Sequence, residues 1–344
     1  MRVLITGGCG FIGSWMVRRA LREPGVERVV NLDCLTYAGT LTNVRDVMAQ
    51  PRHIFEEVDV RDRTGLDRVM REHGVTHVLH LAAESHVDRS IDAPADFITT
   101  NVLGTFHLLE ACRGAWSGNG ARGCRFVHVS TDEVYGSLGA EGLFTEDSPM
   151  APSSPYSASK ASADLLVRAY HRTYGLPTVS TNCSNNYGPC QFPEKLIPVV
   201  VLRAAAGESI PVYGNGLQVR DWLHVEDHCE ALWQVLSSGR DGATYNIGAR
   251  NEWTNMDLVR RVCGMVDEFR GDEKGRAASR IVSVTDRPGH DVRYAIDPGR
   301  IEQELGWRPV RRFEEGLRET VWWYLGNRAW VEEVLGAKAR CARG

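Results

Sequence analysis

Residues 7 to 13, which read Gly-Gly-Cys-Gly-Phe-Ile-Gly, constrain the fold of this chain more than any other stretch. They lie between an apolar segment expected to form a strand, Arg2–Thr6, and a helical pattern expected over residues 14–22. A glycine turn in this position permits a tight bend, the approach of a diphosphate to the backbone, and close packing of helix on strand. The free amides at the start of the helix then favour phosphate groups. We therefore expect a dinucleotide to bind at Gly7, Gly10, Phe11, Ile12 and Gly13.

An acid at the end of the next expected strand indicates which dinucleotide binds. Asp33 follows the strand expected over residues 28–32 and lies twenty residues after Gly13. A carboxylate there accepts hydrogen bonds from ribose hydroxyls and repels a 2′-phosphate, so NAD is expected rather than NADP. Further cofactor contacts are expected after the following strands, at Asp59, Val60, Ala82 and Ala83. For Asp59 the alternative is a helix cap near Arg61.

Three functional side chains, Thr131, Asp132 and Glu133, follow a buried strand expected over residues 125–129. Adjacent residues on a strand face opposite sides, so both carboxyls can reach one ligand only if the backbone leaves extended geometry, which we expect at Thr131. Two neighbouring carboxyls in different environments can hold opposite protonation states, as paired acid and base catalysis requires. The stretch is therefore a candidate catalytic centre.

A second candidate pair is Tyr156 and Lys160, which lie one turn apart if a helix begins near Ser157. A phenol ionises near pH 10, so it acts as a base at neutral pH only when a neighbouring cation stabilises the phenolate. Lys160 is expected to supply that charge. Taken alone, the two residues could equally be a surface pair on a helix.

The alternation of strands and helices over the first 180 residues predicts an α/β fold with a doubly wound parallel sheet of the Rossmann type. Long helices with apolar stripes are expected over residues 94–112 and 157–174. Proline and glycine become frequent after residue 183, and shorter helices are expected near residues 225–236, 255–267 and 313–324. We therefore expect an NAD-binding domain over residues 1–183. A smaller, mainly substrate-binding lobe is expected over 184–344, with segments interleaved between the two.

The composition excludes several other classes of protein. With 24% charged residues, a net charge of -4 and no basic block, the chain does not resemble an electrostatic nucleic-acid binder. Its nine cysteines form no CxxC pair, which fits a reducing cytoplasm. We expect no signal peptide and no membrane span, and hence a cytoplasmic protein. No metal site is expected, because His77 and His80 point to opposite faces of their strand.

With these motifs assembled, the chain resembles the extended short-chain dehydrogenase/reductase superfamily and, within it, the dTDP-glucose 4,6-dehydratases. The spacing of Gly7, Gly10 and Gly13 is a variant found in short-chain dehydrogenases, and the Asp132–Glu133 pair is the most specific match. Thr40 and Thr42 depart from the family pattern, which often has Asn and Glu there. Other matching segments are LDCLTYAGTLTN (32–43), AAESHVDRSI (82–91), SNNYGPCQFPEKLIP (184–198), YGNGLQVRDWLHVEDH (213–228) and DRPGHDVRYAID (286–297).

The resemblance implies a lyase that converts dTDP-glucose to dTDP-4-keto-6-deoxyglucose and water. It implies that Tyr156 takes the proton of the sugar 4-hydroxyl while a hydride passes from C4 to bound NAD. Thr131 would form a hydrogen bond to the C4 oxygen. Glu133 would then remove the C5 proton and Asp132 would protonate the departing C6 hydroxyl, before the hydride returns to C6. The substrate would be bound by Ser85, Asn185, Lys195, Leu196, Tyr213, Arg220, Asn255, Arg287 and His290.

Two other functions remain open at this stage. A nucleotide-sugar 4-epimerase or decarboxylase would share Tyr156, Lys160 and the glycine turn, although epimerases of the superfamily lack the Asp132–Glu133 pair. A catalytically silent NAD-binding sensor would need none of these catalytic residues. A homodimer is expected, because the apolar stripes of the helices over 94–112 and 157–174 can form an intersubunit four-helix bundle.

Overall fold

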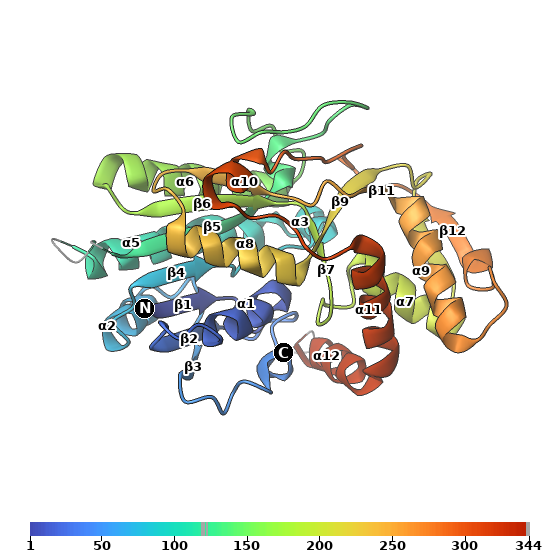
Figure 1. The fold of residues 1–344 in the computed structure, drawn as a ribbon, viewed down its shortest axis with the longest axis horizontal. Coiled ribbons are helices and arrows are strands. Elements are labelled where there is room, and N and C mark those ends of the chain that lie inside the picture. The colour runs from blue at the N-terminus through green and yellow to red at the C-terminus, as the bar shows by residue number, and fades with distance from the viewer. Residues whose placement is uncertain (118–120, 122, 342–344) are drawn as a thin grey trace.

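The computed structural model describes residues 1–117, 121 and 123–341, with side chains up to residue 336. Seven parallel strands form a central sheet in the order β10-β6-β5-β4-β1-β2-β3 (Figure 1). This arrangement confirms the predicted doubly wound parallel sheet. The strands are β1 (Arg2–Thr6), β2 (Arg28–Asp33), β3 (His53–Glu57), β4 (His77–His80), β5 (Arg125–Thr131), β6 (Thr178–Cys183) and β10 (Thr244–Ile247).

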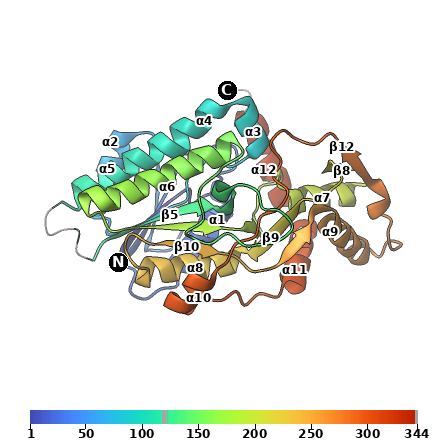
Figure 2. The same cartoon turned by 90° about the horizontal axis from the view of Figure 1, so that it is seen from above.

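Helices cover both faces of this sheet, as seen from above in Figure 2. The first face carries α2 (Arg63–Glu72), α3 (Val87–Asp92), α4 (Pro94–Phe97), α5 (Thr105–Ala115) and α6 (Pro155–Tyr174). The other face carries α1 (Phe11–Leu21), α8 (Val225–Ser238) and α10 (Gly299–Leu305). Each face has its own apolar core, because every buried strand presents alternate side chains to opposite sides.

Several element boundaries differ from the sequence prediction, for local reasons. Helix α1 begins at Phe11, three residues earlier than expected, with Gly10 as its N-cap. Helix α6 begins at Pro155 because Ser154 and Ser157 form a reciprocal capping box. The single helix expected over residues 94–112 is α4 followed by a π-helix, η2 (Ile98–Gly104), and then α5. Strand β5 continues in extended geometry through Thr131, and the backbone changes only at Asp132, one residue later than expected.

The second lobe packs a separate apolar core around two small sheets. Its strands are β7 (Asn185–Tyr187), β9 (Val219–His224) and β11 (Glu252–Thr254) in one sheet, with β8 (Ile210–Tyr213) and β12 (Ile281–Val284) in the other. Its helices are α7 (Leu196–Ala206), α9 (Asn255–Arg270), α11 (Phe313–Gly326) and α12 (Arg328–Cys341). In Figure 1 this lobe lies beside the carboxyl-end edge of the central sheet. The shorter 3₁₀ helices are η1 (Leu41–Val44), η4 (Asp132–Tyr135) and η5 (Ala278–Arg280).

The chain crosses between the two lobes more than once. Strand β10 joins the edge of the central sheet beside β6, although it lies in the second half of the sequence. Helix α12 returns to the first lobe, where the Trp330 indole N–H donates to Asn43 Oδ1 at 2.9 Å. The division at residue 183 stays a prediction, and any such division must include these interleaved segments.

The eight cysteines whose side chains the structure describes are all free. Among the helices that the structure describes, none combines the length and the apolar character needed to cross a membrane.

Candidate active site

A cavity of about 540 Å³ lies where the parallel strands end and the second lobe begins. Such a position outside the carboxyl ends of the strands is where open α/β sheets bind their ligands. The cavity brings together most of the residues that the sequence singled out. From that set it is lined by Gly7, Gly10, Phe11, Ile12, Gly13, Asp33, Asp59, Val60, Ala82, Ala83, Ser85, Thr131, Glu133, Tyr156, Lys160, Asn185 and Lys195.

The glycine turn is shaped to admit a diphosphate. Gly7 has a φ of +70°, and a Cβ added to it would lie 2.8 Å from the backbone of Ala82. A Cβ on Gly13 would lie 2.0 Å from the carbonyl oxygen of Gly7, so only glycine lets α1 start this close to the turn. Gly10, the N-cap, has no side chain with which to cap the helix. The first amides of α1 are thus left to a phosphate, and these residues fit a dinucleotide.

Asp33 lies at the end of β2 and lines the same cavity. Its Oδ2 atom accepts a hydrogen bond from the Cys9 amide and its Oδ1 atom accepts one from the Leu35 amide, both at 2.9 Å. Burial raises the pKa of this carboxyl, while the backbone amides oppose that rise. Asp33 therefore holds the glycine turn in addition to offering a carboxylate to the cavity.

Asp59 also lines the cavity, but it is paired with Arg61. Its Oδ1 atom accepts from the Arg61 amide at 2.8 Å, and its carboxylate receives the guanidinium as well. The alternative assignment as a helix cap is wrong, because the N-cap of α2 is Asp62, whose side chain accepts from Gly65.

The catalytic candidates at the end of β5 stand on a tight turn. Thr131 caps η4, with its hydroxyl oxygen accepting from the Glu133 amide at 3.3 Å. From Asp132 onward the backbone takes 3₁₀ geometry, so the strand alternation that sends neighbouring side chains to opposite faces no longer applies. Gly136 ends the turn at a φ of +86°, where a Cβ would lie 2.4 Å from the Ala151 carbonyl oxygen. Glu133 lines the cavity, and Asp132 is buried and outside its lining.

The two carboxyls differ in their electrostatic surroundings. Burial raises the pKa of Asp132 well above its usual value, and the charges of Glu133 and Asp221 raise it further. Burial also raises the pKa of Glu133, but there the cations Arg220, Arg287 and Lys195 lower it. Within the part of the chain that the structure describes, Asp132 Oδ2 has no hydrogen-bond partner. Asp132 thus favours the protonated acid, whereas at Glu133 three cations oppose the same tendency.

Tyr156 and Lys160 both lie in the first turns of α6 and face the cavity. The Lys160 ammonium donates to the Val129 carbonyl oxygen at 2.8 Å, which ties α6 to β5. Burial and the charge of Glu133 raise the pKa of the Tyr156 phenol well above its usual value, whereas the Thr131 hydroxyl lowers it. In this structure the Lys160 ammonium is therefore directed at the backbone rather than at the phenol.

A buried polar cluster supports Lys160 from behind. Asp164, one turn further along α6, accepts a hydrogen bond from Ser130 Oγ at 2.9 Å and lies 3.3 Å from His128 Nε2. Burial raises the Asp164 pKa to about 7, and Lys160, Ser130 and Asn182 oppose that rise. Burial lowers the pKa of His128 well below its usual value, so this imidazole is neutral. Asp164 is thus the carboxyl that faces the buried ammonium.

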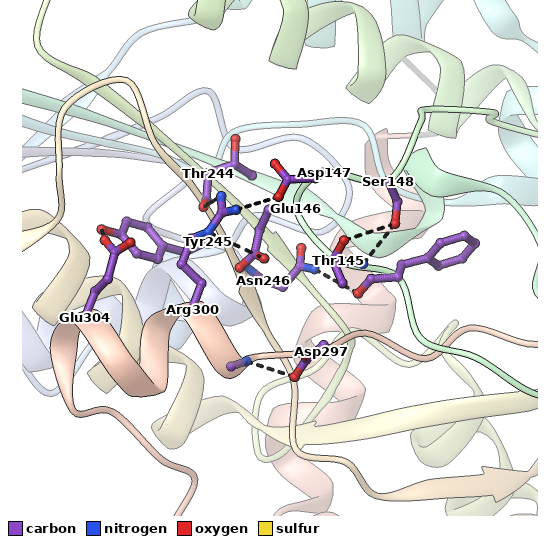
Figure 3. A network of polar contacts seen from close by, with 12 residues as sticks. Thr145, Glu146, Asp147, Ser148, Thr244, Tyr245, Asn246, Asp297, Arg300 and Glu304 are labelled. Atoms are coloured by element: carbon purple, nitrogen blue, oxygen red, sulfur yellow. Dashed lines mark hydrogen bonds and ion pairs between the residues drawn. The ribbon is translucent and has the colours of Figure 1, made fainter.

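A second polar network joins η4 and the loop after it to β10, and Figure 3 shows the part of it around Glu146 and Asn246. Tyr135, the last residue of η4, donates its hydroxyl to Asn246 Oδ1 on β10 at 2.9 Å. The Asn246 side chain donates to the Phe144 carbonyl oxygen at 3.1 Å, and its amide donates to Glu146 Oε1 at 2.9 Å. The rings of Tyr135 and Phe144 stack with centroids 5.2 Å apart. Strand β10 therefore anchors the end of η4, at Tyr135, and the loop that follows it, at Phe144 and Glu146.

The comparisons with known proteins agree with this geometry. The family model described as GDP-mannose 4,6 dehydratase matches residues 4–320. The dTDP-glucose 4,6-dehydratase of Neisseria meningitidis serogroup B is 54% identical over 350 residues, covering 99% of this chain and 98% of the relative. The chain belongs to the dTDP-glucose 4,6-dehydratase family. The dTDP-glucose 4,6-dehydratase 1 of Escherichia coli K12 is 52% identical, covering 97% of this chain and 95% of the relative.

Solved structures of this family have the same fold. DesIV, a dTDP-glucose 4,6-dehydratase from Streptomyces venezuelae solved with NAD bound, superposes with a TM-score of 0.89 at 48% identity. That match covers 97% of this chain and all of the DesIV chain. A UDP-glucose 4-epimerase from Thermus thermophilus superposes with a TM-score of 0.83, covering 95% of this chain and all of the epimerase chain, but at only 33% identity. The similarity therefore favours the dehydratase family over the epimerases.

Near Glu133 of this family member lies a group of cations from the second lobe. Lys195, at the N-cap of α7, donates to the Ser85 carbonyl oxygen at 2.7 Å. The Arg220 guanidinium donates to the Asp291 carbonyl oxygen at 3.0 Å and lies over the Tyr294 ring, 4.1 Å from its centroid. Among the described residues, Arg287 Nη1 is buried without a hydrogen-bond partner. These charges make the region attractive to an anion.

Not every residue assigned to substrate binding lines the cavity of this dehydratase. Arg220 and Arg287 do not line it, but their positive charges lower the pKa of Glu133, which does. Tyr213 donates its hydroxyl to Asp88 Oδ2 at 2.9 Å, and His290 Nδ1 lies 2.6 Å from Asp286 Oδ1. Outside the lining of the cavity are Leu196, Tyr213, Arg220, Asn255, Arg287 and His290, and also Asp132. Their assignment stays a prediction.

The cavity also contains residues that the sequence reasoning did not assign. Asp96 of α4 and Thr100 of the π-helix η2 line it. A π-helix is a local irregularity that frequently accompanies functional sites. Glu194 stands next to Lys195 and accepts a hydrogen bond from the Tyr37 hydroxyl at 2.9 Å. Glu194 had a signal in the sequence, since it lies in the quoted segment 184–198. The π-helix had none, because residues 94–112 show the pattern of an ordinary helix.

Proposed function

We propose that this chain is a dTDP-glucose 4,6-dehydratase, a lyase that converts dTDP-glucose to dTDP-4-keto-6-deoxyglucose and water. The observation that carries the proposal is the pair Asp132 and Glu133 on one turn, where burial and like charges favour protonated Asp132 and three cations oppose the rise in the pKa of Glu133. A 4-epimerase needs no acid and base for dehydration, and a sensor needs neither. The identity of 54% to a dTDP-glucose 4,6-dehydratase supports the same assignment.

NAD is the cofactor that this proposal requires. The glycine turn would hold its diphosphate at the first amides of α1, and Asp33 would accept bonds from a ribose and disfavour NADP. Ala82 and Ala83 leave room beside the turn, with Asp59 and Val60 further along the cavity wall. When bound, NAD supplies a hydride acceptor for C4, a cationic ring, and the same hydride for C6 at the end of the cycle.

We assign the first proton transfer to Tyr156. Its phenol lies in the cavity with Thr131 close to it, and it takes the proton of the sugar 4-hydroxyl as C4 is oxidised. Because burial and Glu133 disfavour the phenolate, Tyr156 needs positive charge in the cavity to act as a base. Lys160 contributes part of that charge, and the Thr131 hydroxyl hydrogen-bonds the C4 oxygen as charge develops on it.

The elimination of water is assigned to the neighbouring carboxyls. With a ketone at C4, the C5 proton becomes acidic, and Glu133 removes it because the cations around it favour its carboxylate form. Asp132, which burial and like charges keep protonated, donates its proton to the departing C6 hydroxyl. The C5–C6 double bond forms as the C6–O bond breaks, so the atoms balance with one water released.

The nucleotide diphosphate is proposed to bind beside Glu133, among the cations Lys195, Arg220 and Arg287. Planar guanidinium groups suit phosphate oxygens, and the buried free Nη1 of Arg287 offers one such donor. Further contacts are proposed from Ser85, Asn185, Leu196, Tyr213, Asn255 and His290, of which Ser85 and Asn185 line the cavity.

We also propose a cytoplasmic homodimer. The helical segment of residues 94–115 and the helix α6 lie side by side and leave large apolar side chains exposed, namely Ile98, Leu103, Phe106 and Leu165. Pairing these two helices with those of a second copy would bury these side chains in a four-helix bundle. The free cysteines support a reducing compartment.

The proposed reaction is tested by incubating the purified protein and NAD with dTDP-glucose and measuring the mass of the sugar nucleotide by mass spectrometry. A dehydratase lowers its mass by one water, whereas a 4-epimerase leaves the mass unchanged and a silent sensor leaves the substrate intact. Tyr156→Phe should abolish the conversion, while Tyr174→Phe, an exposed tyrosine at the end of the same helix, should not. An unchanged mass with the native protein would contradict the proposal.

A further inference from the structure

The C-terminal helix α12 is connected by hydrogen bonds to the glycine turn. The indole N–H of Trp330 donates to Asn43 Oδ1 at 2.9 Å, and Asn43 Nδ2 donates to the Cys9 carbonyl oxygen at 2.9 Å. Cys9 belongs to the turn itself, between Gly8 and Gly10. Trp330 and Asn43 are both buried, with exposed fractions of 9% and 2%, so water competes little for these bonds.

The backbone of Cys9 is held by hydrogen bonds at both its N–H and its carbonyl oxygen. Its amide donates to Asp33 Oδ2 at 2.9 Å, and its carbonyl oxygen also accepts from the Thr40 amide at 3.1 Å. The orientation of the Cys9 backbone determines where the following residues, Gly10 to Gly13, present their amides to the cavity. Asn43 is the only one of these partners whose side chain is itself bonded to α12 among the described contacts.

A second contact joins α12 to the same segment one turn further along. Glu333 Oε1 accepts from the Thr42 hydroxyl at 2.6 Å, and both of its oxygens lie within 3.1 Å of Arg45 Nη2. Thr42 and Asn43 lie in η1, which therefore contacts α12 at a buried and at an exposed point. Thr42 thus contacts α12 in this structure and is not among the residues that line the cavity.

The other side of Trp330 is embedded in the second lobe. Its ring lies 4.9 Å from that of Trp323 and 6.0 Å from that of Tyr324, both on α11. Val331 and Val334 of α12 belong to the same apolar core as α7 and α9. Helix α12 is therefore fixed to the second lobe and reaches from there to η1, whose Asn43 contacts the glycine turn (Figure 1).

We propose that α12 is a clasp that slows dissociation of the dinucleotide, with Trp330 and Asn43 as positioning residues for the glycine turn. This inference rests on the proposed function, in which the hydride taken from C4 must return to C6 of the same sugar. If the dinucleotide dissociates after it has taken the hydride from C4 and before it returns it to C6, the sugar nucleotide is left oxidised at C4 and cannot be converted to product. A dehydratase therefore needs slow release of its cofactor more than a dehydrogenase that exchanges the cofactor in every cycle.

The test measures the rate at which NADH leaves the full-length protein. The protein is loaded with NADH, freed of excess and mixed with an excess of NAD, and release is followed by the fluorescence of NADH itself. Trp330→Phe removes the indole N–H but keeps an aromatic ring in the core. We expect release about five- to tenfold faster than from the native protein, as for the loss of one buried hydrogen bond. Glu333→Ala should give a smaller acceleration, and it changes an exposed side chain that is not part of the apolar core.

The matched control is Trp307→Phe, which removes a buried indole N–H that donates to the Asp227 carbonyl oxygen at 3.1 Å; among the described hydrogen bonds, Trp307 makes none to η1. It should lose comparable stability and leave the release of NADH unchanged. Native-like release from both Trp330→Phe and Glu333→Ala, or equal acceleration by Trp307→Phe, would overturn the clasp. Failure of the native protein to retain NADH or NAD would instead contradict the proposed function, so the two failures are distinguishable.

Discussion

Asp132 and Glu133 are neighbours in the chain, yet their environments differ enough to suggest different roles. The cations near Glu133 come from Lys195, Arg220 and Arg287, all in the second half of the sequence. Asp132 is instead buried beside two other carboxylates, Glu133 and Asp221. The assignment of base and acid made from the sequence agrees with this difference. It could not have been derived from the local sequence, because every cation involved is distant along the chain.

The first prediction concerns these two carboxyls. Glu133→Gln and Asp132→Asn should leave oxidation at C4 intact but slow the loss of water by about 10²–10⁴-fold each, the usual contribution of a general acid or base. Rapid-quench mass spectrometry would then detect the 4-ketoglucose nucleotide before dehydration. Glu141→Gln, an exposed acid in the following loop, serves as the control and should behave like the native protein. Loss of C4 oxidation in both variants would show that the pair acts at the first step instead.

The second prediction concerns Asp164, whose pKa burial raises to about 7 from 3.8. The folded protein keeps a proton on this carboxyl over a range in which the unfolded chain releases it. The associated stability is complete below the unfolded pKa and is lost as the pH rises through 7. As the pH rises from 5 to 7, the unfolding free energy of the native protein should therefore decrease relative to that of Asp164→Asn, by up to about 1.4 kcal/mol per pH unit.

Urea unfolding at several pH values measures this difference. Asp147→Asn is the control, because the Asp147 side chain is 85% exposed and should give a curve parallel to that of the native protein. Parallel curves for Asp164→Asn as well would show that this carboxyl does not titrate near pH 7.

At the scale of elements, the regular parts of the fold were predictable and the irregular parts were not. The strands and the glycine turn follow from local patterns of apolar residues and glycine. The π-helix over Ile98–Gly104 departs from the expected helix without a marker in the sequence. The turn after β5 was predicted, but one residue too early, because Thr131 stays extended as the cap of η4.

The third prediction tests what holds the catalytic turn. Tyr135→Phe removes the hydroxyl that donates to Asn246 on β10 but keeps the ring stacked on Phe144. Dehydration should slow by about tenfold, as expected when one buried hydrogen bond is lost, while the release rate of NADH stays unchanged. Tyr245→Phe is the control, since Tyr245 faces the opposite side of β10 from Asn246 and its hydroxyl donates to Glu304. Native turnover by Tyr135→Phe would show that the turn does not depend on this contact.

At the scale of the whole molecule, the order of segments along the chain could be predicted better than their contacts. The second lobe was expected with interleaved segments, and β10, α8 and α10 are such segments. The return of α12 to η1 was not foreseen, because a Trp and an Asn separated by 287 residues give no local signal of their contact. The same holds for Arg220 and Glu133, which interact only because the second lobe packs over the ends of the strands.

The fourth prediction concerns assembly. Leu103→Arg places a charge on the exposed apolar surface of the helices over residues 94–115, where Leu103 is 42% exposed. It should convert a native dimer into a monomer, because an unpaired charge in an apolar interface is costly. Light scattering at micromolar concentration measures the mass, with Val310→Arg as a control at an 80% exposed position. A monomeric native protein would contradict the dimer itself, and a dimeric Leu103→Arg would contradict this interface.

The central claim is that one bound cofactor takes a hydride from C4 and returns it to C6 of the same sugar, with water lost in between. Its most direct test is dTDP-glucose carrying deuterium at C4, converted by the native protein and analysed by NMR. We predict that the deuterium is found at C6 of the product and that C5 acquires a proton from solvent, as expected from an exchangeable proton on Glu133. Deuterium that is released to solvent, or retained at C4 of the sugar, would contradict the account.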